Sequence, residues 1–242
     1  MDLLSGYVEF TQPATTRDLQ TLQALAADAT VQATISQLRE NYQDLVLAKR
    51  LSVIDIIEDN PGIDISFSTF LRLLPPMRVR QYSISSSPLT SPQRVSLTVS
   101  VVDAPALSNV NRRHLGVASN CLSGLKPSDN IPVVVRPSGV AFHLPNDPIV
   151  PVVMFCAGSG LAPFRGFIME RAAQKASGRD VGKMLLFFGC RAPEEDYLYV
   201  DGVSVSEDLA VLKKWAEEGV VDLRPAFSRR VEASEGCKYV QE

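Results

Sequence analysis

The strongest constraint on the fold lies between residues 151 and 230, where apolar strand patterns alternate with helical ones. PVVMFCAGSGLAPFRGFIMERAAQ (151–174) predicts a buried strand, a glycine-rich turn and an amphipathic helix. KMLLFFGCR (183–191) predicts a second strand, and SEDLAVLKKWAEEGVVDLRPAFSRR (206–230) predicts a helix closed at Gly219 and a third strand. Strands that alternate with helices favour a parallel sheet with right-handed crossovers.

The residues before this segment divide into a helical part and a β-rich part. Residues 1–74 show helical periodicity, with Leu19, Leu22 and Leu25 on one stripe after a capping-box pattern at Thr15 and Asp18. The pattern continues with Ile35, Leu38, Tyr42 and Leu45, and two shorter helices follow, one opening at Ser52 and one spanning SFSTFLRLLPP (66–76). From Met77 the runs RVRQYSISSS, RVSLTVSVV and NIPVVVRPS are β-rich and are separated by turn residues.

Composition excludes several classes of protein. The chain has 242 residues, 45% of them hydrophobic, and charges of both signs sum to −3, which argues against a nucleic-acid surface. The four cysteines form no CxxC pair and only two histidines accompany them, so we expect no metal site and a reduced protein. No apolar run is long enough for a membrane helix and no signal peptide opens the chain, so we expect a cytoplasmic protein.

Three strand ends of the α/β segment carry residues suited to a nucleotide. The turn at Gly158, Ser159 and Gly160 would let a ligand approach the backbone at a helix N-terminus, although Pro163 departs from GxGxxG. Arg191 follows the second strand, and Ser228 and Arg229 follow the third, at the edge where open α/β sheets bind ligands. A hydroxyl beside an arginine suits the 2′-phosphate of NADP. A tight turn without a ligand and solvated arginines are the structural alternatives.

Taken together, six motifs in order resemble one family, the diflavin reductases, which are NADPH–haemoprotein reductases and include the reductase portion of self-sufficient haem monooxygenases. The motifs are RQYSISSSP, GVASNCL, FHLPNDPIVPVVMFCAGSGLAPFRGF, FFGCRAPEEDYLY, AFSRR and KYVQ. VLAKRLSVIDIIEDNP and FSTFLRLLPPMRVRQYSISSSP also resemble the connecting helices of that family and their entry into the flavin site.

The resemblance implies an FAD site on the polar run 80–88. Arg80 would pair with the pyrophosphate, Tyr82 would stack on the isoalloxazine ring, and Ser83 would hydrogen-bond near flavin N5 as the catalytic residue. GVAS would meet the same pyrophosphate at a helix start, and Thr98 and Ser100 would line the adenosine side. The GVAS residues are Gly116, Val117, Ala118 and Ser119.

The resemblance also implies an NADPH site. Ser159 stands where the family usually has threonine, and Arg191, Ser228 and Arg229 match the contacts to the adenosine phosphate. Tyr239 and Gln241 match the later YVQ motif. Cys237 occupies the place of the usual basic residue, and Lys238 is a candidate one position later.

The chain departs from the family in several places. It has no β-rich run before residue 75, it stops before the CGD strand and the C-terminal aromatic, and VDGVSVS (200–206) resembles an insertion. The expectation is therefore a fragment truncated at both ends, without the FMN and haem domains, that holds FAD weakly and oxidises NADPH poorly by itself.

The predicted fold class is α+β and ferredoxin-reductase-like. It comprises a helical connecting segment (1–76), a partial antiparallel FAD β-barrel (77–148) and an incomplete parallel α/β NADP-binding unit (149–242). The predicted function is electron transfer from NADPH through FAD towards FMN and a haem-protein acceptor, with FMN bound by the parent protein and not by this chain. A sulfite-reductase-type flavoprotein and a non-catalytic fragment are the alternatives.

Overall fold

The chain forms two compact units, each built from two separate stretches of sequence. The computed structural model describes residues 4, 6–138, 142–200 and 211–242. The first unit, here the helical unit, is Met1–Arg80 with Val101–Leu125, and the second, here the sheet unit, is Gln81–Ser100 with Lys126–Glu242. The three-part division at residues 76 and 148 stays a prediction.

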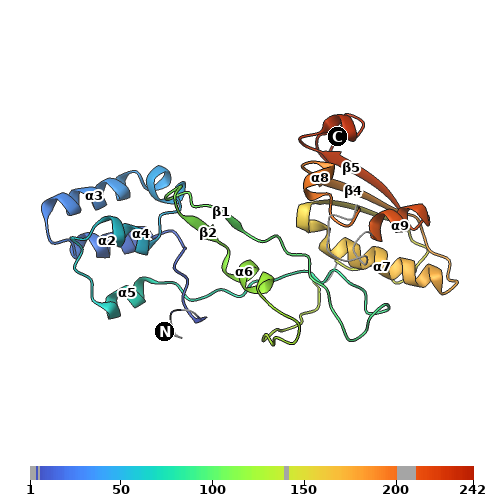
Figure 1. Ribbon diagram of the computed structural model, residues 1–242, viewed down its shortest axis with the longest axis horizontal. Helices are drawn as coiled ribbons and strands as arrows, with labels where there is room; N and C mark the ends of the chain where they lie inside the picture. Colours follow the sequence, from blue (N-terminus) through green and yellow to red (C-terminus); the bar gives the residue numbers. More distant parts are fainter. Residues whose placement is uncertain (1–3, 5, 139–141, 201–210) are drawn as a thin grey trace. The chain divides into compact units, whose positions relative to one another are not determined.

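Among its described residues, the helical unit contains short α-helices, a π-helical turn and a small hairpin that is followed by a further helix (Figure 1). Its elements are α2 (Thr16–Ala24), α3 (Ala29–Glu40), η1 (Gln43–Leu47), α4 (Val53–Asp59), α5 (Phe67–Leu73), β1 (Asp103–Pro105), β2 (Arg113–Leu115) and α6 (Val117–Ser123). Its core is formed by apolar residues of the helices, among them Leu19, Leu22, Ile35, Val46 and Ile56.

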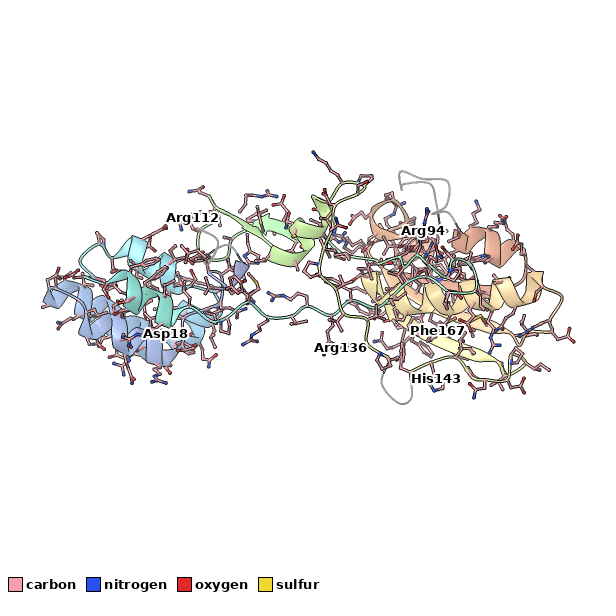
Figure 2. The ribbon with its side chains drawn as sticks, turned by 90° about the horizontal axis from the view of Figure 1, so that it is seen from below. Asp18, Arg94, Arg112, Arg136, His143 and Phe167 are labelled. Atoms are coloured by element: carbon pink, nitrogen blue, oxygen red, sulfur yellow. The ribbon has the colours of Figure 1, made fainter. Side chains whose placement is uncertain are left out.

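Side-chain caps set the starts of α2 and α4, where the sequence predicts a capping box at Thr15 and a helix start at Ser52. Thr15 and Asp18 form the capping box of α2, in which Asp18 Oδ2 accepts from the Thr15 backbone N–H at 2.8 Å. Ser52 and Asp55 form a second box at α4. Arg112, labelled in Figure 2, donates to the other oxygen of Asp55 at 3.1 Å, so the hairpin is tied to the start of α4.

The helical pattern of residues 33–51 is interrupted in the structure. Helix α3 ends at Glu40, and the chain then makes the π-helical turn η1. The Tyr42 hydroxyl, at the junction, donates to the Ala14 carbonyl at 3.0 Å. The chain thus changes from α-helix to π-helix where Tyr42 makes this tertiary hydrogen bond. The periodicity of apolar residues alone does not show such a change.

The described residues of the sheet unit form a three-stranded parallel sheet with strand order β3-β4-β5. Strands β4 and β5 are labelled in Figure 1. The elements are β3 (Val152–Ala157), η2 (Gly158–Leu161), α7 (Ala162–Ala176), β4 (Met184–Cys190), α8 (Pro193–Asp196), α9 (Val211–Glu217), β5 (Val221–Phe227) and η4 (Val231–Ala233). The predicted alternation of strands and helices is confirmed. The predicted helix start at residues 206–210 lies outside the described residues.

Among the described residues, helices cover one face of this sheet. The chain moves in one direction from β3 to β4 to β5, and right-handed crossovers then place α7 and α9 on the same side. Met154, Leu186 and Phe188 pack in the core on that side. On the other face Phe155 is 56% exposed and stacks on Phe187, with ring centroids 4.7 Å apart.

Residues 77–148, which the sequence predicts to be β-rich, show little strand pairing where they are described. Within the described part of residues 77–148, antiparallel pairing comprises the β1–β2 hairpin and an isolated bridge between Ile84 and Leu97. The runs 94–102 and 130–138 are largely exposed, and Val134 is 81% exposed. β-propensity describes fit to a neighbouring strand. Among the described residues, the run 94–102 has only isolated contacts of this kind, such as the bridge from Leu97 to Ile84, and no bridge or strand pairing involves 130–138. The ferredoxin-reductase-like class stands, with an antiparallel and a parallel sheet.

Helix α7 anchors the serine-rich run within the sheet unit. The buried Arg165 donates from Nη1 to the Ser85 carbonyl at 2.6 Å, and Ser87 Oγ donates to Glu170 at 3.3 Å. A Cβ at Gly166 would lie 3.3 Å from the Ser86 carbonyl oxygen, so this glycine permits close backbone approach. On the same helix Phe167 makes an edge contact with Phe164 (Figure 2).

Within the described ranges, no helix combines the length and the apolar character that a membrane crossing requires.

The cap at Ser52 generates a prediction about stability. Ser52 is 2% exposed, and its hydroxyl both donates to Asp55 and accepts from the Asp55 N–H. Replacement Ser52→Ala should lower the free energy of unfolding of the helical unit by about 1–2 kcal/mol because both bonds are lost. Urea unfolding followed by circular dichroism measures it. Thr21→Ala is the control, because it removes a half-buried hydroxyl that donates to the Arg17 carbonyl within α2 and caps no helix. An equal loss there would contradict the role of the cap.

Candidate functional site

The carboxyl ends of the three parallel strands place the predicted nucleotide residues at one edge of the sheet. Strand β4 lies between β3 and β5, and Ser159, Arg191 and Ser228 follow the three strands in that order. The Ser228 N–H donates to the Cys190 carbonyl at 3.0 Å, and the Arg229 N–H donates to the Arg191 carbonyl at 2.9 Å. These backbone bonds extend the β4–β5 pairing beyond the strands and hold the two arginines side by side.

The glycine-rich turn leaves its backbone open at this edge. Gly158 has φ +51, a conformation that disfavours other residues, and a Cβ built there would meet no atom within 4 Å. At Gly160 the nearest atom to such a Cβ is 3.9 Å away. Pro163 stands in the first turn of α7, where its missing N–H costs no hydrogen bond. An extended anion can therefore approach the backbone N–H groups before α7.

Acidic residues of α8 pair with the arginines at the strand ends. Asp196 accepts from the backbone N–H of Arg191 at 2.6 Å and from its Nε at 3.0 Å. Glu195 accepts from Arg229 Nη1, and Glu194 accepts from Arg230 Nη1 at 2.8 Å.

The pKa values at this edge follow from the same pairs. The hydrogen bond that Arg191 donates to Asp196, together with the charge of Asp196, raises the pKa of the Arg191 guanidinium. Hydrogen bonding and charge from Glu232 and Glu194 likewise raise the pKa of Arg230, and Arg230 lowers the pKa of the Glu232 carboxyl. Arg191 and Arg230 therefore stay charged, and each lies beside carboxylates that accept from it.

The C-terminal residues fold back against the same edge. Ser234 is buried, accepts from the Phe227 N–H at 3.0 Å and donates to the Cys237 carbonyl at 2.7 Å. A Cβ at Gly189 would lie 3.2 Å from Val240 Cγ1, which places the YVQ segment against the end of β4. The side chains of Lys238, Tyr239 and Gln241 are exposed there, with Lys238 Nζ 5.3 Å from the Tyr239 ring centroid.

The predicted flavin residues divide between the two units. Arg80 and Gly116–Ser119 belong to the helical unit, whereas Tyr82, Ser83, Thr98 and Ser100 belong to the sheet unit.

In the sheet unit, residues of the serine-rich run, which is the sheet-unit part of the polar run 80–88, differ in their burial. Ser85 and Ser87 are buried against α7, whereas Ser83 is exposed and Tyr82 half-buried. One side of the serine-rich run is therefore anchored on α7, and Ser83 remains accessible to solvent.

The two residues predicted on the adenosine side differ in their surroundings. The hydroxyls of Thr98 and Tyr199 are 2.7 Å apart, and the Arg165 guanidinium lies 4.6 Å from the centroid of the Tyr199 ring. Ser100 is exposed. Thr98 is thus tied to the helix-covered part of the sheet unit.

In the helical unit, Arg80 pairs with a carboxylate of the chain itself. Its Nη2 binds Glu9, which is 3% exposed, and its Nη1 donates to the Arg78 carbonyl at 2.6 Å. The pair keeps Arg80 in place and neutralises it.

The GVAS segment forms the start of α6, as the sequence predicts. Ser119 Oγ donates to the Gly116 carbonyl at 3.2 Å and accepts from the Val102 N–H at 3.1 Å. A hydroxyl has one proton, so Ser119 cannot also donate to a phosphate without giving up the bond to Gly116. The first N–H groups of α6, from Val117 to Ser119, lack intrahelical acceptors and remain the donors of this turn.

Sequence reasoning missed the acids of α8 and the buried Ser234. The sequence analysis considered the arginines and hydroxyls at the strand ends and not the acidic residues beside them. The available signal was the run of three acids in APEED (192–196), directly after Arg191. Ser234 had no signal, because an isolated serine in a loop has no distinctive pattern. Across the described ranges, no cluster of three histidine, cysteine or acidic residues is arranged to hold a metal ion.

Comparison with protein families gives two matches. The family of the FAD binding domain matches residues 1–121, and that of the oxidoreductase NAD-binding domain matches residues 154–217.

Comparison with curated proteins finds relatives along the whole chain. A self-sufficient cytochrome P450 monooxygenase of Phanerodontia chrysosporium is 56% identical over 241 residues, which is 100% of this chain and 22% of the relative. Bifunctional cytochrome P450/NADPH–P450 reductases are 46% identical in Acremonium egyptiacum and 47% in Fusarium oxysporum, also over 100% of this chain and 22% of their own length. The chain therefore spans about a fifth of the length of the curated relatives that it matches.

The buried cysteines of the sheet generate a prediction about reactivity. Burial raises the pKa of Cys156 to about 12, and burial, Asp196 and Cys156 raise that of Cys190 to about 12. At pH 8 roughly one molecule in ten thousand of each then carries a thiolate, the reactive form. Iodoacetamide at pH 8, followed by peptide mass mapping, should label the exposed Cys121 and spare both buried cysteines. Labelling of Cys156 at the rate of Cys121 in folded protein would contradict this expectation.

Proposed function

Because this chain belongs to the diflavin reductase family, we propose that it is the FAD- and NADPH-binding part of a protein that carries electrons from NADPH through FAD towards FMN and a haem protein. The observation that carries the proposal is the meeting of Arg191, Ser228 and Arg229 beside an open glycine turn, in a chain whose first half matches the FAD binding domain.

The NADPH end of the proposal rests on complementary chemistry at the sheet edge. Two guanidiniums and a hydroxyl on neighbouring strand ends supply charge-assisted donors for the 2′-phosphate. The open turn at Gly158–Gly160 supplies backbone N–H groups for the pyrophosphate, and Ser159 adds a hydroxyl. Tyr239 and Gln241 are proposed to contact the nucleotide from the C-terminal segment, with Lys238 as a further cation.

The FAD end of the proposal uses the serine-rich run and the start of α6. Tyr82 stacks on the flavin ring, the accessible Ser83 donates near N5, and the N–H groups of Val117, Ala118 and Ser119 receive the pyrophosphate. Arg80 would donate a hydrogen bond from its guanidinium, which Glu9 holds in place. Thr98 and Ser100 line the adenosine side. These donor types fit FAD, which when bound accepts hydride at N5 and passes electrons on one at a time.

The chain's own residues contribute position and electrostatics to this transfer. The bonds from Arg165 to Ser85 and from Ser87 to Glu170 fix the run that carries Ser83 on α7, the helix that opens at the nucleotide turn. The hydride donor and acceptor must be held within a fraction of an ångström, and a rigid anchor of this kind reduces misplacement.

The proposed partners are an FMN domain and a haem protein. The relatives' names join a cytochrome P450 to an NADPH–P450 reductase in one chain, which supports a haem acceptor. A cytoplasmic location and an FMN domain as the next carrier complete the proposal.

The arginine at the end of β5 provides a test of nucleotide preference. In the reductase protein that contains this chain, Arg229→Ala should raise KM for NADPH about ten- to a hundredfold and leave KM for NADH unchanged, because a charge-assisted bond to the 2′-phosphate is lost. Steady-state kinetics with both nucleotides measures the effect. Arg224→Ala, which removes an exposed arginine of the same strand paired with Asp222, is the matched control. Equal losses for NADPH and NADH would refute the assignment.

The ring of Tyr82 provides a test of the flavin assignment. Tyr82→Ala should weaken FAD binding about two- to tenfold because the stacking contact is lost, whereas Tyr82→Phe keeps the ring and should retain wild-type binding. Titration of apoprotein with FAD, followed by quenching of flavin fluorescence, measures both. Equal affinity of the alanine variant and the wild type would show that Tyr82 does not stack on the flavin.

A further inference from the structure

Glu195 of α8 bridges two of the arginines proposed to hold the 2′-phosphate. Its Oε2 lies 3.4 Å from Arg191 Nε and 3.1 Å from Arg229 Nη1, and its Oε1 lies 3.3 Å from the same Arg229 nitrogen. The two arginines follow neighbouring strands and are joined through their backbones, so one carboxylate reaches both without distorting the chain.

The three acids of α8 have different partners. Asp196 binds the backbone N–H groups of Arg191 and Ala192, at 2.6 and 3.4 Å, and so fixes the turn after β4. Glu194 accepts from Arg230 at 2.8 Å. Among the described acids of α8, Glu195 alone contacts both Arg191 and Arg229.

A carboxylate and a phosphate compete for the same guanidinium nitrogens. Both are oxyanions that accept charge-assisted hydrogen bonds from arginine. A phosphate dianion is also repelled by the negative charge of a nearby carboxylate. The side chains of Arg191, Arg229 and Glu195 are 52%, 60% and 37% exposed, so solvent screens the pairs and the competition is modest.

We propose that Glu195 is a specificity-determining residue that occupies the arginine pair in the absence of nucleotide and lowers the affinity of the site for the 2′-phosphate. This inference rests on the proposed function, in which Arg229 binds that phosphate. An internal competitor weakens the hold on NADP⁺ after reaction and favours its release. It leaves NADH unaffected, because NADH carries no 2′-phosphate.

The test measures binding of two probes to the 242-residue chain by isothermal titration calorimetry. The probes are 2′,5′-ADP, which carries the 2′-phosphate, and 5′-AMP, which lacks it. Glu195→Gln should bind 2′,5′-ADP about two- to fivefold more tightly than the wild type, the range expected from removing an exposed ion pair, and should bind 5′-AMP equally well. Glu194→Gln, which makes the same change in net charge on the same helix, should change binding of 2′,5′-ADP less than twofold.

Arg229→Ala separates failure of this inference from failure of the proposed function. If Arg229→Ala weakens 2′,5′-ADP selectively and Glu195→Gln does not tighten it, the role of Glu195 is refuted and the nucleotide site stands. An equal gain in Glu194→Gln also refutes it, because net charge then explains the effect. If Arg229→Ala leaves both probes unchanged, or the wild type does not bind 2′,5′-ADP, the proposed site falls and the role of Glu195 with it.

Discussion

The register of the parallel β3–β4–β5 sheet is the constraint on which the candidate nucleotide site depends. Cys190 pairs with Phe227, and the bonds from Ser228 and Arg229 to the end of β4 continue that pairing. A shift of the register by one residue would turn every side chain to the opposite face and separate the arginines from their acids. The apolar packing of Met154, Leu186 and Phe188 under α7 and α9 therefore also maintains the geometry at the sheet edge.

In both proposed cofactor sites, an arginine is paired with a carboxylate of the chain itself. Arg80 is held by the buried Glu9, and Arg229 is held by the exposed Glu195. Separating an arginine from a buried carboxylate is costly, because the buried charge is left uncompensated. An exposed carboxylate is solvated by water when it leaves the arginine, so a competing anion displaces it at small cost. Glu9 thus acts as a support, and Glu195 as a competitor.

Within the sheet unit, helix α7 contacts both the serine-rich run and the glycine-rich turn proposed to bind the nucleotide. Its N-terminal end follows the nucleotide turn, and its middle, at Arg165 and Gly166, receives the serine-rich run. The resemblance assigned the run as a whole to a flavin site and gave Ser83 the flavin contact, whereas Ser85 and Ser87 contact the helix. Extended chain alternates its side chains between two sides, and a sequence of serines alone does not indicate which side a helix covers.

The sequence by itself determined the order of elements, the capping box at Thr15, the helix start at Ser52, and the set of residues at the strand ends. These depend on local rules, namely periodicity, side-chain capping and the direction of parallel strands. Tertiary structure alone decided which residues pair at the sheet edge, how Ser234 folds the C-terminal loop, and that the valine runs of residues 94–102 and 130–138 stay largely unpaired. The physical reason is that ion pairs, buried hydrogen bonds and strand pairing each need a second partner distant in sequence, and no local pattern specifies that partner.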